Sequence, residues 1–326
     1  MLADNKVVDV HYHVVSPKLA KEISGCVPVP DIFRPEQLTT EEEQLETAEK
    51  NGVHILWVSS RTLRHYVGPK EVPASSPHVL TVARVTNDYL ASVCQRYPGR
   101  FMAFADIPLA YGDAAIIEMR RGLTGLGLHG ICLQTNYDGK PLDAPEFEPF
   151  FNEANRLKAV IHVHPIAPRV AEEAFQGSSA ASSVLGFTYD TTLTFIRLAY
   201  AGVLERYPDL TFILSHAGGT IPFLWWRINM PYDGNRPGTR DHIKYPPTSY
   251  LERCYYDTAL TDTETLMFTR RRVGDHLMFG TDRPYGPRDG LQHSLKSVRA
   301  MRIPEETKAK IMSGNALALS RRSLPE

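Results

Sequence analysis

The sequence predicts a single (β/α)8 TIM barrel, an α/β fold in which eight parallel strands alternate with helices. Short runs of β-branched and aromatic residues alternate with longer helical stretches, and eight such strand–helix pairs fit within the 326 residues. Strict alternation implies parallel strands joined by crossover helices, and eight repeats close into a barrel. No Gly-x-Gly-x-x-Gly follows the first strand, which argues against an open doubly wound sheet.

The predicted strands are short apolar runs whose last residues are often polar. The first reads Val-Val-Asp-Val-His-Tyr-His, and the second is equally rich in β-branched and aromatic residues. The eight strands are expected at residues 7–13, 53–59, 101–107, 130–136, 159–165, 211–216, 254–259 and 276–282.

The helices are expected between these strands. The first is rich in Glu and closed by Gly52, and the second ends before Pro98 and Gly99, as suits helix C-termini. We expect helices at 36–51, 82–97, 113–122, 145–157, 189–207, a stretch ending at 226, 262–272, and a helical tail that breaks at 304. Residues 1–326 then form one domain, with loop insertions near 14–35, 60–80, 166–188 and 230–250.

Composition excludes several classes of function. The formal net charge is -1, so there is no basic excess to bind a nucleic acid backbone. The longest apolar runs are strand-sized, so no membrane span is expected. No signal peptide is visible before the first strand, which favours a cytoplasmic protein. The four scattered cysteines are expected to be free thiols.

The first strand carries a pair of histidines that organises the rest of the prediction. His11 and His13 are one residue apart, and side chains in a strand alternate faces, so both imidazoles point the same way. Two imidazoles on one rigid face can hold one cation. Alone, however, a His-x-His pair is common by chance.

Other polar strand ends fall at the same rim of the barrel. His162 and His164 end the fifth strand, His216 ends the sixth, and Asp282 ends the eighth. Chemistry in such barrels sits at the C-terminal ends of the strands, which predicts a metal site there. By contrast, three other histidines belong to the N-terminal ends of strands and are interpreted as structural or solvated: His54, His129 and His276.

The depth of each residue in its strand sorts the candidate ligands. His11, His13, His164 and Asp282 form the predicted ligand set for one divalent metal. Three imidazoles and one carboxylate suit Zn2+ and leave one position open, although Mn2+, Fe2+ or Co2+ could occupy the same set. His162 lies deeper and is interpreted as a supporting or core histidine.

Asp9 shares the inward parity of the first strand. It either orients a ligand imidazole or is a satisfied buried carboxylate.

His216 is the acid–base candidate because it precedes Gly218 and Gly219, which let backbone or substrate come close. An unligated imidazole titrates near neutral pH and can exchange a proton with metal-bound water. The alternative is that His216 is a fifth ligand. No lysine ends the fourth strand, where it could bridge a second metal, so one metal is favoured.

The chain resembles the amidohydrolase superfamily, within it the group that includes aminocarboxymuconate-semialdehyde decarboxylase. The matching motifs keep their order over about 300 residues: 9–13, 164–165, 202–210 running into 215–219, 279–282 with Pro284, and 314–316. The resemblance implies one divalent metal on His11, His13, His164 and Asp282, usually zinc, and a catalytic His216. It also implies a homodimer or homotetramer.

Two departures from the family pattern concern the substrate. The helix before the second strand lacks the substrate-binding arginine of the aminocarboxymuconate enzymes. Arg61 could replace it, although an exposed loop arginine is the simpler interpretation. Arg283 follows Asp282 where an aromatic residue is usual, and it could clamp a carboxylate of the substrate.

Three functions compete. The family favours a metal-dependent nonoxidative decarboxylase of an unsaturated or aromatic carboxylic acid, in which metal-bound water with His216, or Asp282, protonates the carbon that loses CO2. The alternative is a hydrolase of a C–C, ester, lactone or amide bond that uses metal-activated water. A non-catalytic barrel that only binds metal or ligand is the third.

Overall fold

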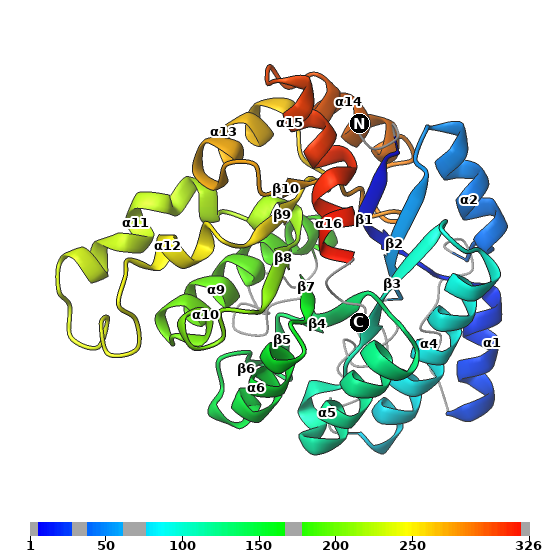
Figure 1. The fold of residues 1–326 in the computed structure, drawn as a ribbon, viewed down its shortest axis with the longest axis horizontal. Helices are drawn as coiled ribbons and strands as arrows, with labels where there is room; N and C mark the ends of the chain where they lie inside the picture. The colour runs from blue at the N-terminus through cyan, green and yellow to red at the C-terminus, as the bar shows by residue number, and fades with distance from the viewer. Residues whose placement is uncertain (1–5, 28–37, 61–75, 167–177, 321–326) are drawn as a thin grey trace.

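The computed structural model describes residues 6–27, 38–60, 76–166 and 178–320, and it confirms the predicted barrel. Eight strands lie in the order β1-β2-β3-β4-β7-β8-β9-β10, and every neighbouring pair is parallel (Figure 1). Their bounds are β1 Val8–His13, β2 Ile55–Ser59, β3 Phe101–Asp106, β4 Gly130–Gln134, β7 Val160–His164, β8 Thr211–Leu214, β9 Tyr255–Asp257 and β10 Leu277–Met278.

The sheet closes between β1 and the segment that follows β10. The Val10 N–H donates to the Phe279 carbonyl at 2.9 Å, and the His13 N–H donates to the Arg283 carbonyl at 2.7 Å. Between them, the Asp282 N–H donates to the His11 carbonyl at 2.7 Å. The eighth strand is therefore shorter than the predicted 276–282, because residues 279–283 pair with β1 irregularly.

Helices follow the strands and form the outer layer (Figure 1). Their bounds are α1 Pro17–Cys26, α2 Glu41–Lys50, α4 Pro77–Arg96, α5 Asp113–Arg120, α6 Glu148–Arg156, α8 Ser179–Ala181, α9 Phe187–Tyr200, α10 Val203–Arg206, α11 Ile221–Asp233, α12 Pro247–Leu251, α13 Thr263–Val273, α14 Gly290–Arg299, α15 Glu305–Ala309 and α16 Asn315–Ser320. Local chemistry sets some of these ends. A capping box between Thr40 and Glu43 starts α2, for example.

Several segments differ from their sequence-based expectation. Residues 14–35 contain α1, which Ser16 caps, rather than only a loop. The predicted helix 189–207 is two helices, because Gly202 has a φ of 72° and separates α9 from α10. Residues 230–250 contain the end of α11 and most of α12. A hairpin of β5 (Asn136–Tyr137) and β6 (Lys140–Pro141) follows β4.

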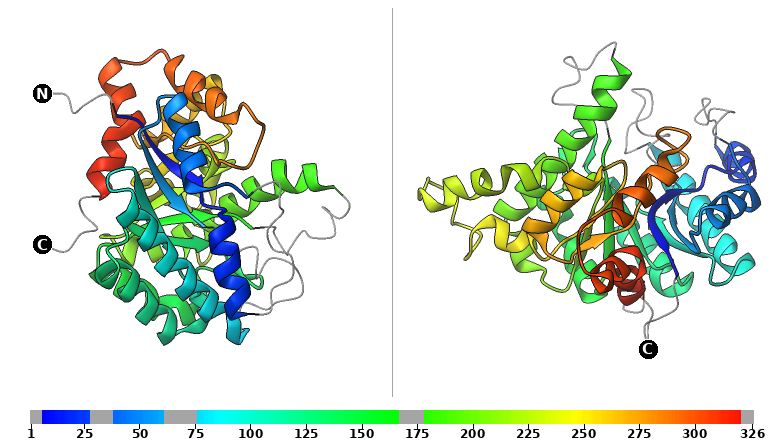
Figure 2. Two further views of the ribbon diagram at one scale, coloured as in Figure 1. Left: turned by 90° about the vertical axis from the view of Figure 1, so that its right-hand side faces the viewer. Right: turned by 90° about the horizontal axis from the view of Figure 1, so that it is seen from above.

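Two apolar layers hold the barrel. The larger packs the outer face of the strands against the helices. The smaller fills the barrel interior, where Trp57 stacks on Phe104 with ring centroids 4.6 Å apart. Ala316 and Leu319 of α16 join this inner cluster. Figure 2 shows α16 at one end of the molecule and the start of α9 projecting at the other. Apolar side chains fill the barrel interior and its base, so the polar groups gather at the C-terminal ends of the strands.

Among the described residues, no helix is long and apolar enough to cross a membrane. All four cysteines are free, as the sequence predicted.

Candidate active site

A bulge in β1 sets the direction of its side chains. The pairing with β2 runs from Asp9↔Leu56 to Tyr12↔Val58, so Val10 and His11 together lie opposite Trp57. Such a bulge re-aims side chains next to a site. Val8 and Val10 belong to the inner cluster, and the imidazoles of His11 and His13 follow them on the inside with ring centroids 5.1 Å apart.

The same bulge overturns the expected parity of Asp9. Its carboxylate lies between β1 and the segment after β10, where it accepts from the backbone N–H groups of His11 and Thr281, each at 3.1 Å, and from the Thr281 hydroxyl. Asp9 therefore contacts no ligand imidazole, and it is the satisfied buried carboxylate of the two interpretations.

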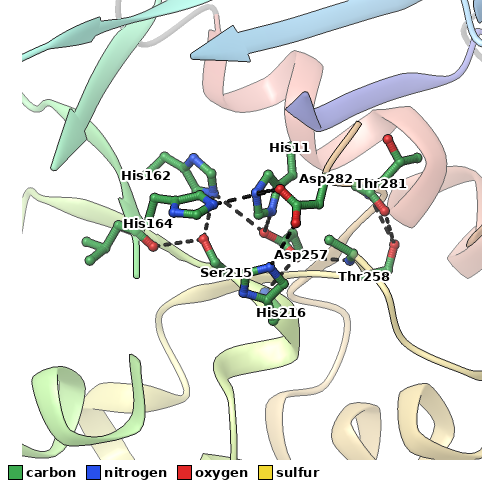
Figure 3. A network of polar contacts seen from close by, with 12 residues as sticks. His11, His162, His164, Ser215, His216, Asp257, Thr258, Thr281 and Asp282 are labelled. Atoms are coloured by element: carbon green, nitrogen blue, oxygen red, sulfur yellow. Dashed lines mark hydrogen bonds and ion pairs between the residues drawn. The ribbon is translucent and has the colours of Figure 1, made fainter. Parts of the chain in front are cut away.

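Four imidazoles converge on Asp282 at the rim, and Figure 3 shows three of them, those of His11, His164 and His216, around its carboxylate. The Nε2 atoms of His13, His11 and His164 lie 2.9, 3.1 and 3.8 Å from Asp282 Oδ1, and His216 Nε2 lies 3.5 Å from Oδ2. These residues come from β1, β7, the turn after β8 and the segment after β10. The structure thus brings together all five residues that the sequence singled out for the metal and acid–base chemistry.

The donor set fits a divalent cation. Ligand atoms of His11, His164, His216 and Asp282 all lie within 4.8 Å of one another. Two ligands about 2.0–2.2 Å from one zinc ion can be at most about 4.4 Å apart, so shifts of a few tenths of an ångström would let them share an ion. His13 is outside this mutual group, but its Nε2 lies 2.9 Å from Oδ1 of Asp282, which is a member. His11 Nε2 is buried and lies 3.1 Å from Asp282 Oδ1, an arrangement that suits two ligands of one metal.

Two carboxylates, those of Asp257 and Asp282, flank the His11 imidazole. Burial alone would lower its pKa, but the carboxylates of Asp257 and Asp282 outweigh burial and raise that pKa to about 10. Burial would likewise raise the pKa of Asp282, but His11 and the other imidazoles hold it well below its usual range. The pocket favours positive charge at its centre, which a divalent cation supplies.

His216 lies in a tightly wound turn at the end of β8. His216, Ala217, Gly218 and Gly219 all have positive φ, at 54°, 53°, 76° and 64°. Positive φ is uncommon for residues other than glycine and is typical of functional turns. The turn lifts the His216 imidazole beside Asp282. His216 is within the mutual ligand group, so the alternative of a fifth metal ligand stays open.

Asp257 is a site residue that sequence reasoning missed. It ends β9, is fully buried, and its Oδ2 lies 2.7 Å from His11 Nδ1. Its other oxygen accepts the backbone N–H of His216 at 2.9 Å. The available signal was an acidic residue inside the predicted seventh strand, close to the rim.

His162 lies deeper in the barrel than His164 and beside Ser215 and Asp257. Its Nε2 lies 3.1 Å from the Ser215 hydroxyl and 3.5 Å from Asp257 Oδ2. Burial lowers its pKa to about 4, although Asp257 opposes that shift, so the imidazole is neutral at pH 7.

Arg61 and Arg283 were the predicted substrate-binding residues. Arg61 lies outside the described residues. The Arg283 guanidinium lies beside the Tyr12 hydroxyl, where it opposes the rise that burial imposes on the pKa of Tyr12. Tyr285, which was not predicted, has its ring centroid 5.4 Å from that of His13. An aromatic side chain thus borders the imidazoles at the rim.

A closed parallel barrel with imidazoles and a carboxylate gathered at its C-terminal rim is the architecture of a metal-dependent barrel enzyme. The chain belongs to the amidohydrolase family, whose profile matches residues 8–322. This confirms the resemblance that the sequence motifs carried.

The known proteins most similar to the chain include decarboxylases. A 2-amino-3-carboxymuconate-6-semialdehyde decarboxylase from Dictyostelium discoideum is 29% identical over 75% of this chain and 67% of its own length. A gamma-resorcylate decarboxylase from Rhizobium radiobacter is 27% identical over 96% of this chain and 97% of its own length. The crystal structure of a 2,6-dihydroxybenzoate decarboxylase complexed with 2,6-dihydroxybenzoate has a TM-score of 0.83 and 26% identity, covering 97% of this chain and 99% of the other.

Proposed function

We propose that this protein is a metal-dependent nonoxidative decarboxylase of an unsaturated or aromatic carboxylic acid. The observation that carries the proposal is the convergence of His11, His13, His164 and His216 on Asp282 at the rim of the barrel. The similarity to decarboxylases along nearly the whole chain supports it.

The proposed ligands are His11, His13, His164 and Asp282. Zinc is the first candidate because imidazole-rich sets suit it, and Mn2+, Fe2+ or Co2+ are the alternatives. When bound, the metal supplies positive charge that holds and polarises an oxygen of the substrate.

The chain's own groups supply the proton. His216 Nε2 and Asp282 Oδ2 lie 3.5 Å apart, so a proton can pass between them with a small movement. One of them protonates the substrate carbon that bears the carboxylate. The bond from that carbon to the carboxylate then breaks, its electron pair stays with the carbon, and CO2 leaves. One proton from solvent restores the donor in each turnover.

Residues around the site would bind and shield the substrate. Tyr285 borders His13 and offers an aromatic face to a planar acid. Arg283 and Arg61 are the proposed partners for further carboxylate or hydroxyl groups. We also propose that residues 1–326 form one barrel domain that assembles as a homodimer or homotetramer in the cytoplasm.

The test is CO2 release from a panel of aromatic and unsaturated carboxylic acids, with metal-loaded protein. Wild type should release one CO2 per product molecule, and His216→Asn should lose turnover while keeping its metal. His242→Asn is the matched control, because His242 is exposed on the surface. Products that keep the carboxylate but gain the elements of water would instead show a hydrolase. Loss of metal from His216→Asn would make His216 a ligand.

A further inference from the structure

We infer that Asp257 is the positioning residue that holds the two halves of the site, the metal ligand His11 and the acid–base residue His216, in register. This inference rests on the proposed function, because it assumes that His11 binds a metal. Asp257 is fully buried at the end of β9 and reaches both residues with one carboxylate.

Each oxygen of Asp257 faces hydrogen-bond donors. Oδ1 accepts the backbone N–H of His216 at 2.9 Å and that of Ala259 at 3.0 Å. Oδ2 lies 2.7 Å from His11 Nδ1 and 3.5 Å from His162 Nε2. A backbone N–H cannot act as an acceptor, so Oδ1 must be an acceptor. With Asp257 as a carboxylate, Oδ2 also accepts, and its 2.7 Å contact with His11 keeps a proton on Nδ1. When a metal is bound, the Nε2 lone pair of His11 is then the one that faces it, beside Asp282.

The fold makes room for this contact at one position. A Cβ on Gly280 would lie 2.9 Å from the Cβ of His11 and 3.1 Å from that of Asp257, closer than ordinary contacts. Gly280 belongs to the segment after β10, which lies between β1 and β9, and its lack of a side chain therefore lets these two side chains meet.

The bond to His216 has a separate role. His216 and Ala217 have φ values of 54° and 53°, a left-handed conformation that is unfavourable for residues other than glycine. The hydrogen bond from the His216 N–H to Asp257 holds the first of these residues in that conformation. One carboxylate thus fixes the tautomer of His11 and the backbone that carries the His216 imidazole.

Asparagine at position 257 cannot reproduce this pattern. If its amide nitrogen replaced Oδ1, it would oppose the N–H groups of His216 and Ala259. If it replaced Oδ2, His11 would have to accept at Nδ1, which moves its proton to Nε2 and blocks the lone pair that faces the metal. The variant is therefore a test of the tautomer and not only of packing.

The experiment is a zinc titration of metal-free protein against a competing chelator, for wild type, Asp257→Asn and Glu118→Gln. Glu118 is an equally buried carboxylate, but it bonds Asn87 and Arg121 in the outer layer. Asp257→Asn should weaken zinc binding about 10- to 100-fold, and Glu118→Gln by less than about threefold. Equal affinities for wild type and Asp257→Asn, or equal losses in both variants, would overturn the inference.

A second measurement does not depend on whether the variants fold. In ¹⁵N-histidine-labelled, zinc-loaded wild type, the His11 ring should show a proton on Nδ1 and a metal-shifted Nε2. A zinc-bound or unprotonated Nδ1 would contradict the inference. Neither the zinc titration nor the NMR measurement uses a substrate. Both can therefore be interpreted even if the protein releases no CO2 from any acid in the panel. Wild type that binds no zinc would instead remove the metal site on which the proposed function depends.

Discussion

Gly218→Ala should damage the turn that carries His216, and Gly99→Ala is its matched control. Both glycines have positive φ, 76° and 73°, so alanine meets a similar backbone penalty at each, about 1–2 kcal/mol. Their surroundings differ. A Cβ on Gly218 would lie 2.5 Å from Cε1 and 2.6 Å from Cδ1 of Tyr256, whereas a Cβ on Gly99 would meet nothing within 4 Å.

The Tyr256 ring cannot easily move aside. It is fully buried, and its hydroxyl donates to the Leu251 carbonyl at 2.9 Å. Forcing extra atoms into a packed core costs typically 1–3 kcal/mol, so Gly218→Ala should be less stable than Gly99→Ala by about that amount. For a protein of this size, the difference corresponds to a melting temperature lower by roughly 2–10 °C.

Urea and thermal unfolding of both variants measure this difference, and CO2 release measures its effect on the site. Displacement of the turn by a few tenths of an ångström misplaces the His216 imidazole, so Gly218→Ala should also lose activity, by about tenfold or more, while Gly99→Ala should not. Equal stabilities and equal activities for the two variants would refute this account of the turn.

Three further variants test other parts of the structure. Burial raises the pKa of Asp190 to about 6, above its usual 3.8, so ionisation of this group lowers the stability of the wild type as the pH rises from 4 to 6. The free energy of unfolding of Asp190→Asn, measured in urea, should therefore rise relative to that of wild type by on the order of 2–3 kcal/mol between pH 4 and pH 7. A pH-independent difference between the two proteins would contradict this. Thr40→Ala removes the capping box of α2 and should lower the free energy of unfolding by about 1 kcal/mol, while Thr47→Ala in the same helix should change it little. Ser59→Ala removes the hydroxyl 2.9 Å from His13 Nδ1 and should weaken zinc affinity about tenfold, and unchanged affinity would show that this bond does not orient His13.

The parts of the site that were predictable from the sequence depend on strand order alone. His13 and His164 end their strands, and His216 and Asp282 lie two and four residues beyond the ends of theirs, so a closed parallel barrel brings all four to one rim. The alternation of strand residues also placed His11 beside His13 correctly. These inferences need no knowledge of how neighbouring strands are shifted relative to one another.

What escaped prediction depends on that register. The bulge in β1 leaves no mark in the sequence, and it turned the Asp9 carboxylate away from the imidazoles toward Thr281. Asp257 reaches His11 from β9, past the segment after β10, a contact between residues 246 positions apart that alternation along one strand cannot show. Gly202 likewise divides a helix that sequence reasoning had drawn as continuous. It has a left-handed conformation, and a Cβ there would lie 2.3 Å from the His242 carbonyl oxygen, a contact 40 residues away that the sequence does not show.

The central claim is that the imidazoles and Asp282 hold one divalent metal. The most direct test is elemental analysis of protein purified without added metal, for wild type and Asp282→Ala. About one divalent ion per chain in the wild type, largely lost from a folded Asp282→Ala, is the expected result, and the same data identify the metal as zinc, manganese, iron or cobalt. Wild-type protein that carries no metal even after reconstitution, or an Asp282→Ala variant that keeps it fully, would contradict the claim.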